Sequence, residues 1–138
     1  MYLVPIETRK STIEGTGVFT LEAIKKGTVV WKYVAGHDQS LSVVDYEKLD
    51  ESGKQYMKKV AYLSPTSGQY VFPPENDPAL YTNHDASHHN LTAIMDKNIS
   101  PEPHFIANRD ITPGEELTNN YHEFDVAIAT MPHKPSWL

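Results

Sequence analysis

Apolar and polar positions alternate over short stretches in the first quarter of the chain, which is the pattern of half-buried β-strands. The stretches "YLVPI", "GVFTLEAI" and "GTVVWKYV" are rich in β-branched and aromatic residues, and glycines lie between them. Glycine in such positions is typical of turns. The pattern therefore predicts strands over residues 2–6, 17–24 and 27–34.

A helical pattern follows between residues 42 and 63. Ser42 is a suitable N-cap for a first helix, and Ser52 is a suitable N-cap for a second helix with the body "GKQYMKKVAYL". The apolar spacing would place three residues on one face of that second helix: Tyr56, Val60 and Leu63. We expect this region to be a helical insertion in a β-rich chain.

The second half of the chain returns to short strands. "GQYVF" is typical of a strand that ends at two prolines, and residues 90–96 and 104–111 predict a strand pair. "TPGEE" predicts a turn, while residues 126–138 hold two prolines and no periodicity. The sequence therefore predicts a mainly β domain with short helices over residues 1–125, followed by a C-terminal tail or lid.

Composition limits the chemistry that the chain can perform. The chain has no cysteine and a formal net charge of -6. Disulfides, thiolate catalysis and sulfur-bound zinc are therefore excluded. The negative charge argues against direct nucleic-acid binding and favours basic partners such as lysine-rich protein segments. Because the sequence has no long apolar run and no secretory signal pattern, we expect no membrane span and a cytoplasmic location.

The stretch "EGTGVF" raises the possibility of a phosphate-binding loop. A dinucleotide fingerprint needs a third glycine and a following helix, but Thr20 stands at that position and strand-like residues follow. Two readings stay open for Gly15 and Gly17. They allow a ligand to approach the backbone closely, or they form an ordinary turn.

The stretch "YTNHDASHHN" holds three histidines and an aspartate within ten residues. His84, His88 and His89, alone or together with Asp85, have side chains that bind zinc or nickel. The surrounding residues are turn formers, however, which favours a polar loop with surface histidines over a metal site. A metal-dependent hydrolase therefore stays as a minor alternative.

The stretch "TPGEELTNNY" places Glu115 and Glu116 next to each other. Two carboxylates can act as general acid and base when they share a site. Neighbours in a strand point to opposite faces, so these two are expected to have separate surroundings. We expect one exposed carboxylate and one buried, structural carboxylate.

Taken in order, three motifs resemble those of the SET-domain lysine methyltransferases. They are Gly15-Thr16-Gly17, then Asn83-His84, then Gly114-Glu115-Glu116-Leu117 with a tyrosine at Tyr121. The chain to about residue 125 is similar to the small stand-alone form of bacteria and viruses. The resemblance implies a β-clip-like fold of several small curled sheets, with a knot-like crossing near the C-terminus where the Asn-His segment passes beneath the segment ending in the tyrosine.

The resemblance also implies that the chain binds S-adenosylmethionine and releases S-adenosylhomocysteine. Asn83 would hydrogen-bond the methionine end of that ligand, and the backbone of His84 would contact its adenine. The residues expected to bind the cofactor are Gly15, Thr16, Gly17, Tyr81, Asn83, His84 and Tyr121.

The Asn-His loop departs from the pattern of the family it resembles. Asp85 stands where the family has serine, no proline follows, and the second asparagine falls one place late at Asn90. A one-residue insertion explains this shift. No role is assigned to Asp85, His88 or His89, and a metal is not expected at this site.

Catalysis by such an enzyme is a direct methyl transfer to a neutral lysine amine, which depends mainly on positioning. The resemblance implies that Tyr121 is the catalytic residue and that Glu116 ties the crossing together. Candidate walls of the substrate channel are Tyr33, Asn119, Phe124 and Trp137. In many relatives the residue two before the tyrosine is Phe or Tyr and limits the number of methyl groups added. Asn119 stands there, so that number is not carried over.

The leading hypothesis is therefore a protein-lysine N-methyltransferase that acts on a lysine-containing protein, with histone-like and ribosomal proteins as candidate basic substrates. The alternative is a non-catalytic SET-like module that binds cofactor or peptide. We expect no direct contact with nucleic acid or membrane, and either a monomer or a homodimer. Action in a host nucleus stays open beside the cytoplasmic location.

Overall fold

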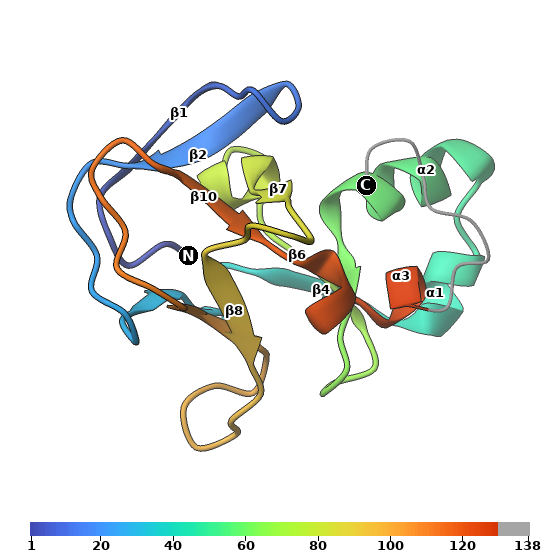
Figure 1. Cartoon of the computed structure of the whole chain (residues 1–138). Coiled ribbons are helices and arrows are strands. Elements are labelled where there is room, and N and C mark those ends of the chain that lie inside the picture. Colours follow the sequence, from blue (N-terminus) through green and yellow to red (C-terminus); the bar gives the residue numbers. More distant parts are fainter. Residues whose placement is uncertain (130–138) are drawn as a thin grey trace.

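The computed structural model describes residues 1–129 of the 138-residue chain. This part is mainly β, with three small sheets and a few short helices. Figure 1 shows the α-helices gathered at one end of the molecule. The expected fold class, a mainly β chain with short helices, is confirmed.

The first sheet joins segments from both ends of the sequence. Its order is β1 (Ile6–Lys10), β2 (Thr16–Thr20), β10 (Glu116–Asn119) and β7 (Asn83–His84). β1 and β2 form an antiparallel hairpin, and β10 pairs antiparallel with β2. β7 lies parallel to β10, with Asn119 opposite His84. The Gly-Thr-Gly, Asn-His and Glu-Leu motifs are therefore neighbours in one sheet (Figure 1).

The second sheet carries much of the hydrophobic core. Its order is β3 (Val29–Trp31), β9 (His104–Ala107) and β8 (Leu91–Ile94), so the expected strand pair is present as β8 and β9. Phe105 packs edge-on against Trp31 and Phe124, with ring centroids 5.6 Å and 4.8 Å away. These aromatic contacts contribute stability beyond the area they bury.

The third sheet supports the helical insertion. It has the order β4 (Gln39–Leu41), β6 (Tyr70–Phe72) and β5 (Tyr62–Leu63), and α1 (Val43–Glu47) and α2 (Glu51–Val60) lie between β4 and β5 in the chain. Tyr46 of α1 stacks on Tyr70 of β6 with ring centroids 4.4 Å apart. This contact attaches the short helix to the sheet.

The remaining elements are short. They are η1 (Pro78–Tyr81), η2 (Tyr121–Glu123) and α3 (Val126–Ala129). Ile128 of α3 is buried. The domain boundary after residue 125 stays a prediction. No helix in residues 1–129 is long and apolar enough to cross a membrane.

The first predicted strand is wrong in its position. β1 begins at Ile6, whereas Tyr2 forms only an isolated bridge to Trp31. Pro5 has no backbone N–H to donate to a strand ladder, which explains the interruption. β2 ends at Thr20, earlier than predicted, because the Thr20 hydroxyl donates to the Glu22 carbonyl at 2.7 Å and closes a turn.

The start and the buried face of the second helix also differ from the prediction. Ser42 caps α1 as expected, but α2 is capped by Asp50 instead of Ser52, and the Asp50 carboxylate accepts from the Gly53 N–H at 2.7 Å. Met57 is the buried residue, while Tyr56 is 52% exposed. The helix ends before Leu63, which belongs to β5, so the assumed face does not form.

These caps generate a stability prediction. Asp50→Ala removes the hydrogen bond to Gly53 and should cost about 1 kcal/mol, a fall in melting temperature of roughly 3–6 °C for a chain of this size. Ser52→Ala serves as the matched control and should leave the melting temperature nearly unchanged. Calorimetry of both variants tests the assignment, and a larger loss for the Ser52 variant would contradict it.

Candidate active site

The contact between β7 and the loop before β2 is held by one amide. The Asn83 side-chain nitrogen lies 2.8 Å from a carboxylate oxygen of Glu116 and 3.1 and 3.3 Å from the carbonyl oxygens of Glu14 and Thr16. These contacts cross three segments that are far apart in sequence. Asn83, the predicted cofactor ligand, therefore connects β7 to β10 and to the loop before β2.

A second asparagine attaches the loop that contains His88 and His89 to β10. The Asn90 amide donates to the Glu116 carbonyl at 2.8 Å, and its side-chain oxygen accepts from the Thr118 N–H at 2.9 Å. Asn90 is almost fully buried. Its two polar ends are thus satisfied by the backbone of one strand, which orients β10 relative to the loop.

The Glu116 carboxylate lies at the centre of this arrangement. It accepts from the Ser11 hydroxyl at 2.7 Å as well as from Asn83. It also lies directly against Gly17, where any Cβ would collide with it. Gly15, in contrast, has φ +45° and open space around it, so it serves the hairpin turn. Glycine is therefore needed at the two positions for different reasons: at Gly15 for the conformation of the turn, and at Gly17 for the space that the Glu116 carboxylate occupies.

The neighbouring carboxylate has its own partner. Glu115 lies 3.1 Å from the Arg109 guanidinium and accepts from the Thr112 N–H at 2.6 Å. Both glutamates are half-buried, and they share no partner. Paired acid–base chemistry by Glu115 and Glu116 is therefore not supported by the geometry.

Tyr121 follows β10 and is held at two points. Its backbone N–H donates to His84 Nδ1 at 3.0 Å, and its hydroxyl donates to the Thr82 carbonyl at 2.7 Å. The rings of His84 and Tyr121 lie 5.0 Å apart. Burial, helped by the negative charges of Glu14 and Asp125, raises the pKa of the Tyr121 hydroxyl. The hydroxyl therefore keeps its proton at neutral pH.

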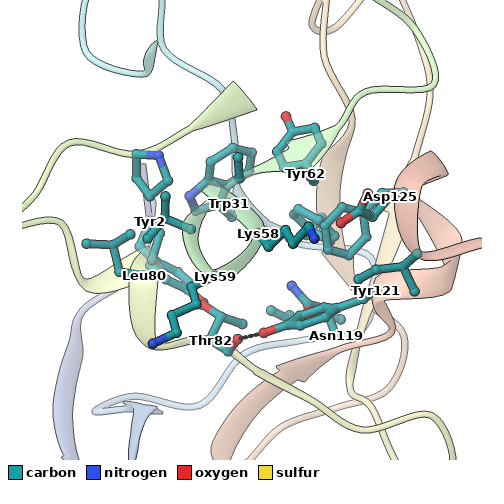
Figure 2. Close-up of a pocket in the computed structure, with 18 residues that line it drawn as sticks. Tyr2, Trp31, Lys58, Lys59, Tyr62, Leu80, Thr82, Asn119, Tyr121 and Asp125 are labelled. Atoms are coloured by element: carbon teal, nitrogen blue, oxygen red, sulfur yellow. Dashed lines mark hydrogen bonds between the residues drawn. The ribbon is translucent and has the colours of Figure 1, made fainter. Parts of the chain in front are cut away.

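The structure has a pocket of about 90 Å³ with Tyr121 in its wall. Figure 2 shows aromatic rings around it and the hydrogen bond from Tyr121 to Thr82 on one side. The rings come from separate parts of the chain: Tyr2, Trp31, Tyr62, Phe105, Tyr121 and Phe124. Such a pocket accepts an apolar stem, and aromatic faces also attract a cation.

Several polar atoms in the pocket wall have no hydrogen-bond partner within the described part of the chain. They are Trp31 Nε1, Tyr62 Oη and Asn119 Oδ1. Trp31 and Asn119 are more than nine-tenths buried. Because unpaired buried polar groups are costly, these atoms are the positions in the wall that still lack a hydrogen-bond partner.

Asp125 adds a carboxylate to the same wall. It accepts from the Leu63 N–H at 3.1 Å and the Ala127 N–H at 3.0 Å, which links β5 to α3. Burial raises the pKa of the Asp125 carboxyl to about 6, although these backbone N–H groups act in the opposite direction. The pocket therefore contains an acid that titrates below neutral pH.

The predicted site residues fall into separate places. Asn119, Phe124 and Tyr121 line the pocket. Tyr33 packs against the core and does not line the pocket, and Trp137 lies outside the described residues. The expected cofactor residues lie at the crossing, around Glu116 and outside the pocket lining: Gly15, Thr16, Gly17, Asn83 and His84.

Tyr81 lies at the end of η1 and is 47% exposed, near the Asn-His strand. Sequence reasoning missed the contributions of Tyr2, Trp31, Tyr62 and Asp125 to the pocket. None of them has a motif around it, because they lie in separate segments of the chain and only the folded chain brings them together. The single available signal was their aromatic or acidic character.

The three histidines do not converge. His84 faces Tyr121, while the His88 side chain is 86% exposed with Nδ1 3.9 Å from Asp85. His89 contacts Glu123 at 3.4 Å instead. Residues 1–129 contain no group of three or more His, Asp or Glu side chains placed to hold a metal ion. The described part of the chain therefore offers no ligand set for a metal-dependent hydrolase.

Comparison with known proteins assigns the class. The SET-domain family model matches residues 15–122, so the chain belongs to the SET-domain family, as the motif order predicted. Members of this family are typically protein-lysine methyltransferases that use S-adenosylmethionine. No curated protein gives a significant match to the chain.

A solved structure supports the fold. The chain is similar to a crystal structure from Plasmodium falciparum described as a "putative histone methyltransferase", with a TM-score of 0.58 and 20% sequence identity. The match covers 86% of this chain and 93% of that chain. At this level of identity the likeness establishes the SET-domain fold.

Asp125 generates a prediction about pH. A carboxyl whose pKa rises from 3.8 to about 6 on folding stabilises the native state only while protonated. Its contribution is complete below pH 4, is lost as pH rises through 6, and amounts to about 3 kcal/mol. Asp125→Asn keeps an acceptor oxygen but has no charge to titrate. Relative to this variant, the free energy of unfolding of the wild type should fall by about 3 kcal/mol between pH 4 and pH 7. Urea titrations at several pH values measure it, and parallel pH profiles for the two proteins would contradict it.

Proposed function

We propose that this chain is an S-adenosylmethionine-dependent protein-lysine N-methyltransferase. The observation that carries the proposal is the position of Tyr121. Its hydroxyl lies in the wall of the aromatic pocket, while its backbone is bonded to His84 of the Asn-His segment. Tyr121 thus joins a pocket that suits a lysine side chain to the segment expected to bind the cofactor.

The pocket has the properties that a lysine side chain requires. The ring faces of Trp31, Tyr62 and Phe124 can pack on its methylene stem, and the Tyr121 hydroxyl oxygen can accept from its amine. Desolvation in such a pocket favours the neutral form of an amine, which the reaction needs. The formal net charge of -6 supports a basic protein substrate, such as a histone-like or ribosomal protein.

The residues at the crossing fit a cofactor on the other side of Tyr121. Gly15 has open space around it, Asn83 is half-buried, and Tyr81 exposes its ring at the end of η1. Backbone near Gly15, the Asn83 amide and the Tyr81 ring would hold S-adenosylmethionine there. When bound, this group supplies an electrophilic methyl carbon attached to a sulfonium.

Tyr121 has a defined part in the reaction. Its hydroxyl donates to the Thr82 carbonyl, and a phenolic oxygen that donates its hydrogen keeps lone pairs with which to accept. An N–H of the target amine bonded to that oxygen would turn the amine lone pair away from the tyrosine. Positioning of this kind is the main contribution that such a reaction needs from the protein.

A non-catalytic module that binds cofactor or peptide is the second candidate. It is favoured by Asn83, whose amide is already bonded to Glu116 and two carbonyl groups, and by Asp85, whose carboxylate accepts from two backbone N–H groups in its own loop. The two candidates share the binding sites and differ in turnover. A measured reaction therefore decides between them.

The cofactor assignment predicts a thermal shift. S-Adenosylmethionine at 100 times its dissociation constant should stabilise the protein by about 2.7 kcal/mol, because it binds only the native state. Asn83→Ala should weaken cofactor binding at a cost of about 1–3 kcal/mol. His88→Ala is the control, since that ring is exposed, and should leave the affinity unchanged.

Asn83→Ala also removes the bond to Glu116, so its stability without ligand must be measured first. Calorimetric titration of the folded variant then reports affinity alone. No thermal shift with the wild type, or a larger loss for the histidine variant, would refute the cofactor site.

The catalytic assignment predicts the behaviour of Tyr121→Phe. The ring remains, so cofactor affinity should change little, while the single-turnover methylation rate should fall roughly ten- to a thousandfold. Loss of the bond to Thr82 should cost only about 1 kcal/mol of stability. The substrate is a panel of lysine-rich proteins analysed by mass spectrometry.

A structural role for the same hydroxyl predicts the reverse pattern. Stability would then fall while the rate per folded molecule held. Melting temperature, cofactor affinity and rate are therefore measured on one preparation. An unchanged rate would remove Tyr121 from the reaction.

A further inference from the structure

One lysine of the chain lies at its own pocket. Lys58 stands in the last turn of α2 and lines the pocket together with Tyr62, Asn119 and Tyr121. Figure 2 shows its amine directed into the pocket between Tyr62 and Tyr121. Lys58 as a whole is nevertheless exposed.

The adjacent lysine has a different direction. Lys59 also lines the pocket, but Figure 2 shows its amine extending past Thr82, away from Tyr62 and Asp125. The two lysines have the same charge and occupy the same helical turn. They form a matched pair that differs in orientation.

Within residues 1–129 no carboxylate forms an ion pair with Lys58. Lys54, one turn earlier on α2, pairs with Glu47 at 3.4 Å, whereas Lys58 has no side-chain ion pair or hydrogen bond within residues 1–129. Both Lys58 and Lys59 interact favourably with the helix dipole at the C-terminal end. That role is common to the pair and does not explain why one amine enters the pocket.

We propose that Lys58 is a substrate of its own chain, methylated in the pocket that contains it. The inference rests on the proposed methyltransferase function and names one target of that site. In the step, the Lys58 amine first loses a proton to water. Its Nζ lone pair then forms a bond to the methyl carbon of the sulfonium donor. The carbon–sulfur bond breaks with its electron pair moving to sulfur, which leaves a methylated Lys58 and a neutral thioether.

The same geometry makes Lys58 a competitor for protein substrates. A tethered side chain has a local concentration on the order of millimolar at a neighbouring site, so it competes with lysines that arrive from solution. Replacing Lys58 with alanine should therefore strengthen the binding of a lysine-containing peptide by about tenfold. The Lys59→Ala variant loses the same positive charge, so the gain that is specific to Lys58 is the difference in affinity between the two variants.

The test uses the whole chain and S-adenosylmethionine with a deuterated methyl group, which distinguishes new methyl groups from any gained during expression. After incubation, peptide mapping by mass spectrometry locates the label. We expect label at Lys58 in the wild type and in Lys59→Arg, and at least about tenfold less in Tyr121→Phe. The labelled fraction at a given time should not depend on protein concentration, because the reaction is intramolecular.

A lysine-rich peptide is included in the same reactions, so that the two proposals fail separately. Methylated peptide with unlabelled Lys58 overturns self-methylation and leaves the proposed function in place. Label at Lys59 only, or a labelled fraction that rises in proportion to protein concentration, also overturns it. If neither peptide nor chain is labelled, the methyltransferase function itself fails. Peptide binding without cofactor, measured by fluorescence anisotropy, is the independent readout, and equal affinity in the two alanine variants contradicts the competition.

Discussion

The Glu116 carboxylate accepts from Ser11 and Asn83 and occupies the space that a side chain at position 17 would need. This one group therefore joins the hairpin of β1 and β2, the Asn-His strand and the strand that leads to Tyr121. A half-buried carboxylate is stable in such a place only if its oxygens are hydrogen-bonded, which restricts the residues around it. The three sequence motifs are neighbours in space because they share this contact.

The position of Tyr121 follows from that contact. β10 is aligned by its pairing with β2 and β7 and by the Asn90 side chain, so Tyr121, two residues after the end of β10, is placed with little freedom. His84 and Thr82 then hold the backbone and the hydroxyl of Tyr121. A reaction that depends on positioning benefits from such a restrained group, and the helical insertion supplies the opposite wall of the pocket.

Much of the architecture could be predicted from local patterns. The pairing of β8 with β9, the Ser42 cap and the turn at Gly114 depend on residues close together in sequence. The prediction of the helix start was wrong where a nearby residue competed for the N-cap position. Asp50 and Ser52 are both suitable caps two positions apart, and Asp50 prevailed because its carboxylate reaches the Gly53 N–H. In the same helix Met57 is the buried residue and Tyr56 is exposed.

The sequence by itself determined the family, through three short motifs in a set order, and with it the fold class and the candidate roles of Asn83, His84 and Tyr121. Only the tertiary structure decided the composition of the pocket. Tyr2, Trp31, Tyr62 and Asp125 come from four separate segments of the chain, and no local pattern connects them. The orientation of the Lys58 side chain also could not be predicted from the sequence. A helical pattern reports which face of a helix is apolar, whereas the direction of one exposed amine depends on the side chains packed opposite it.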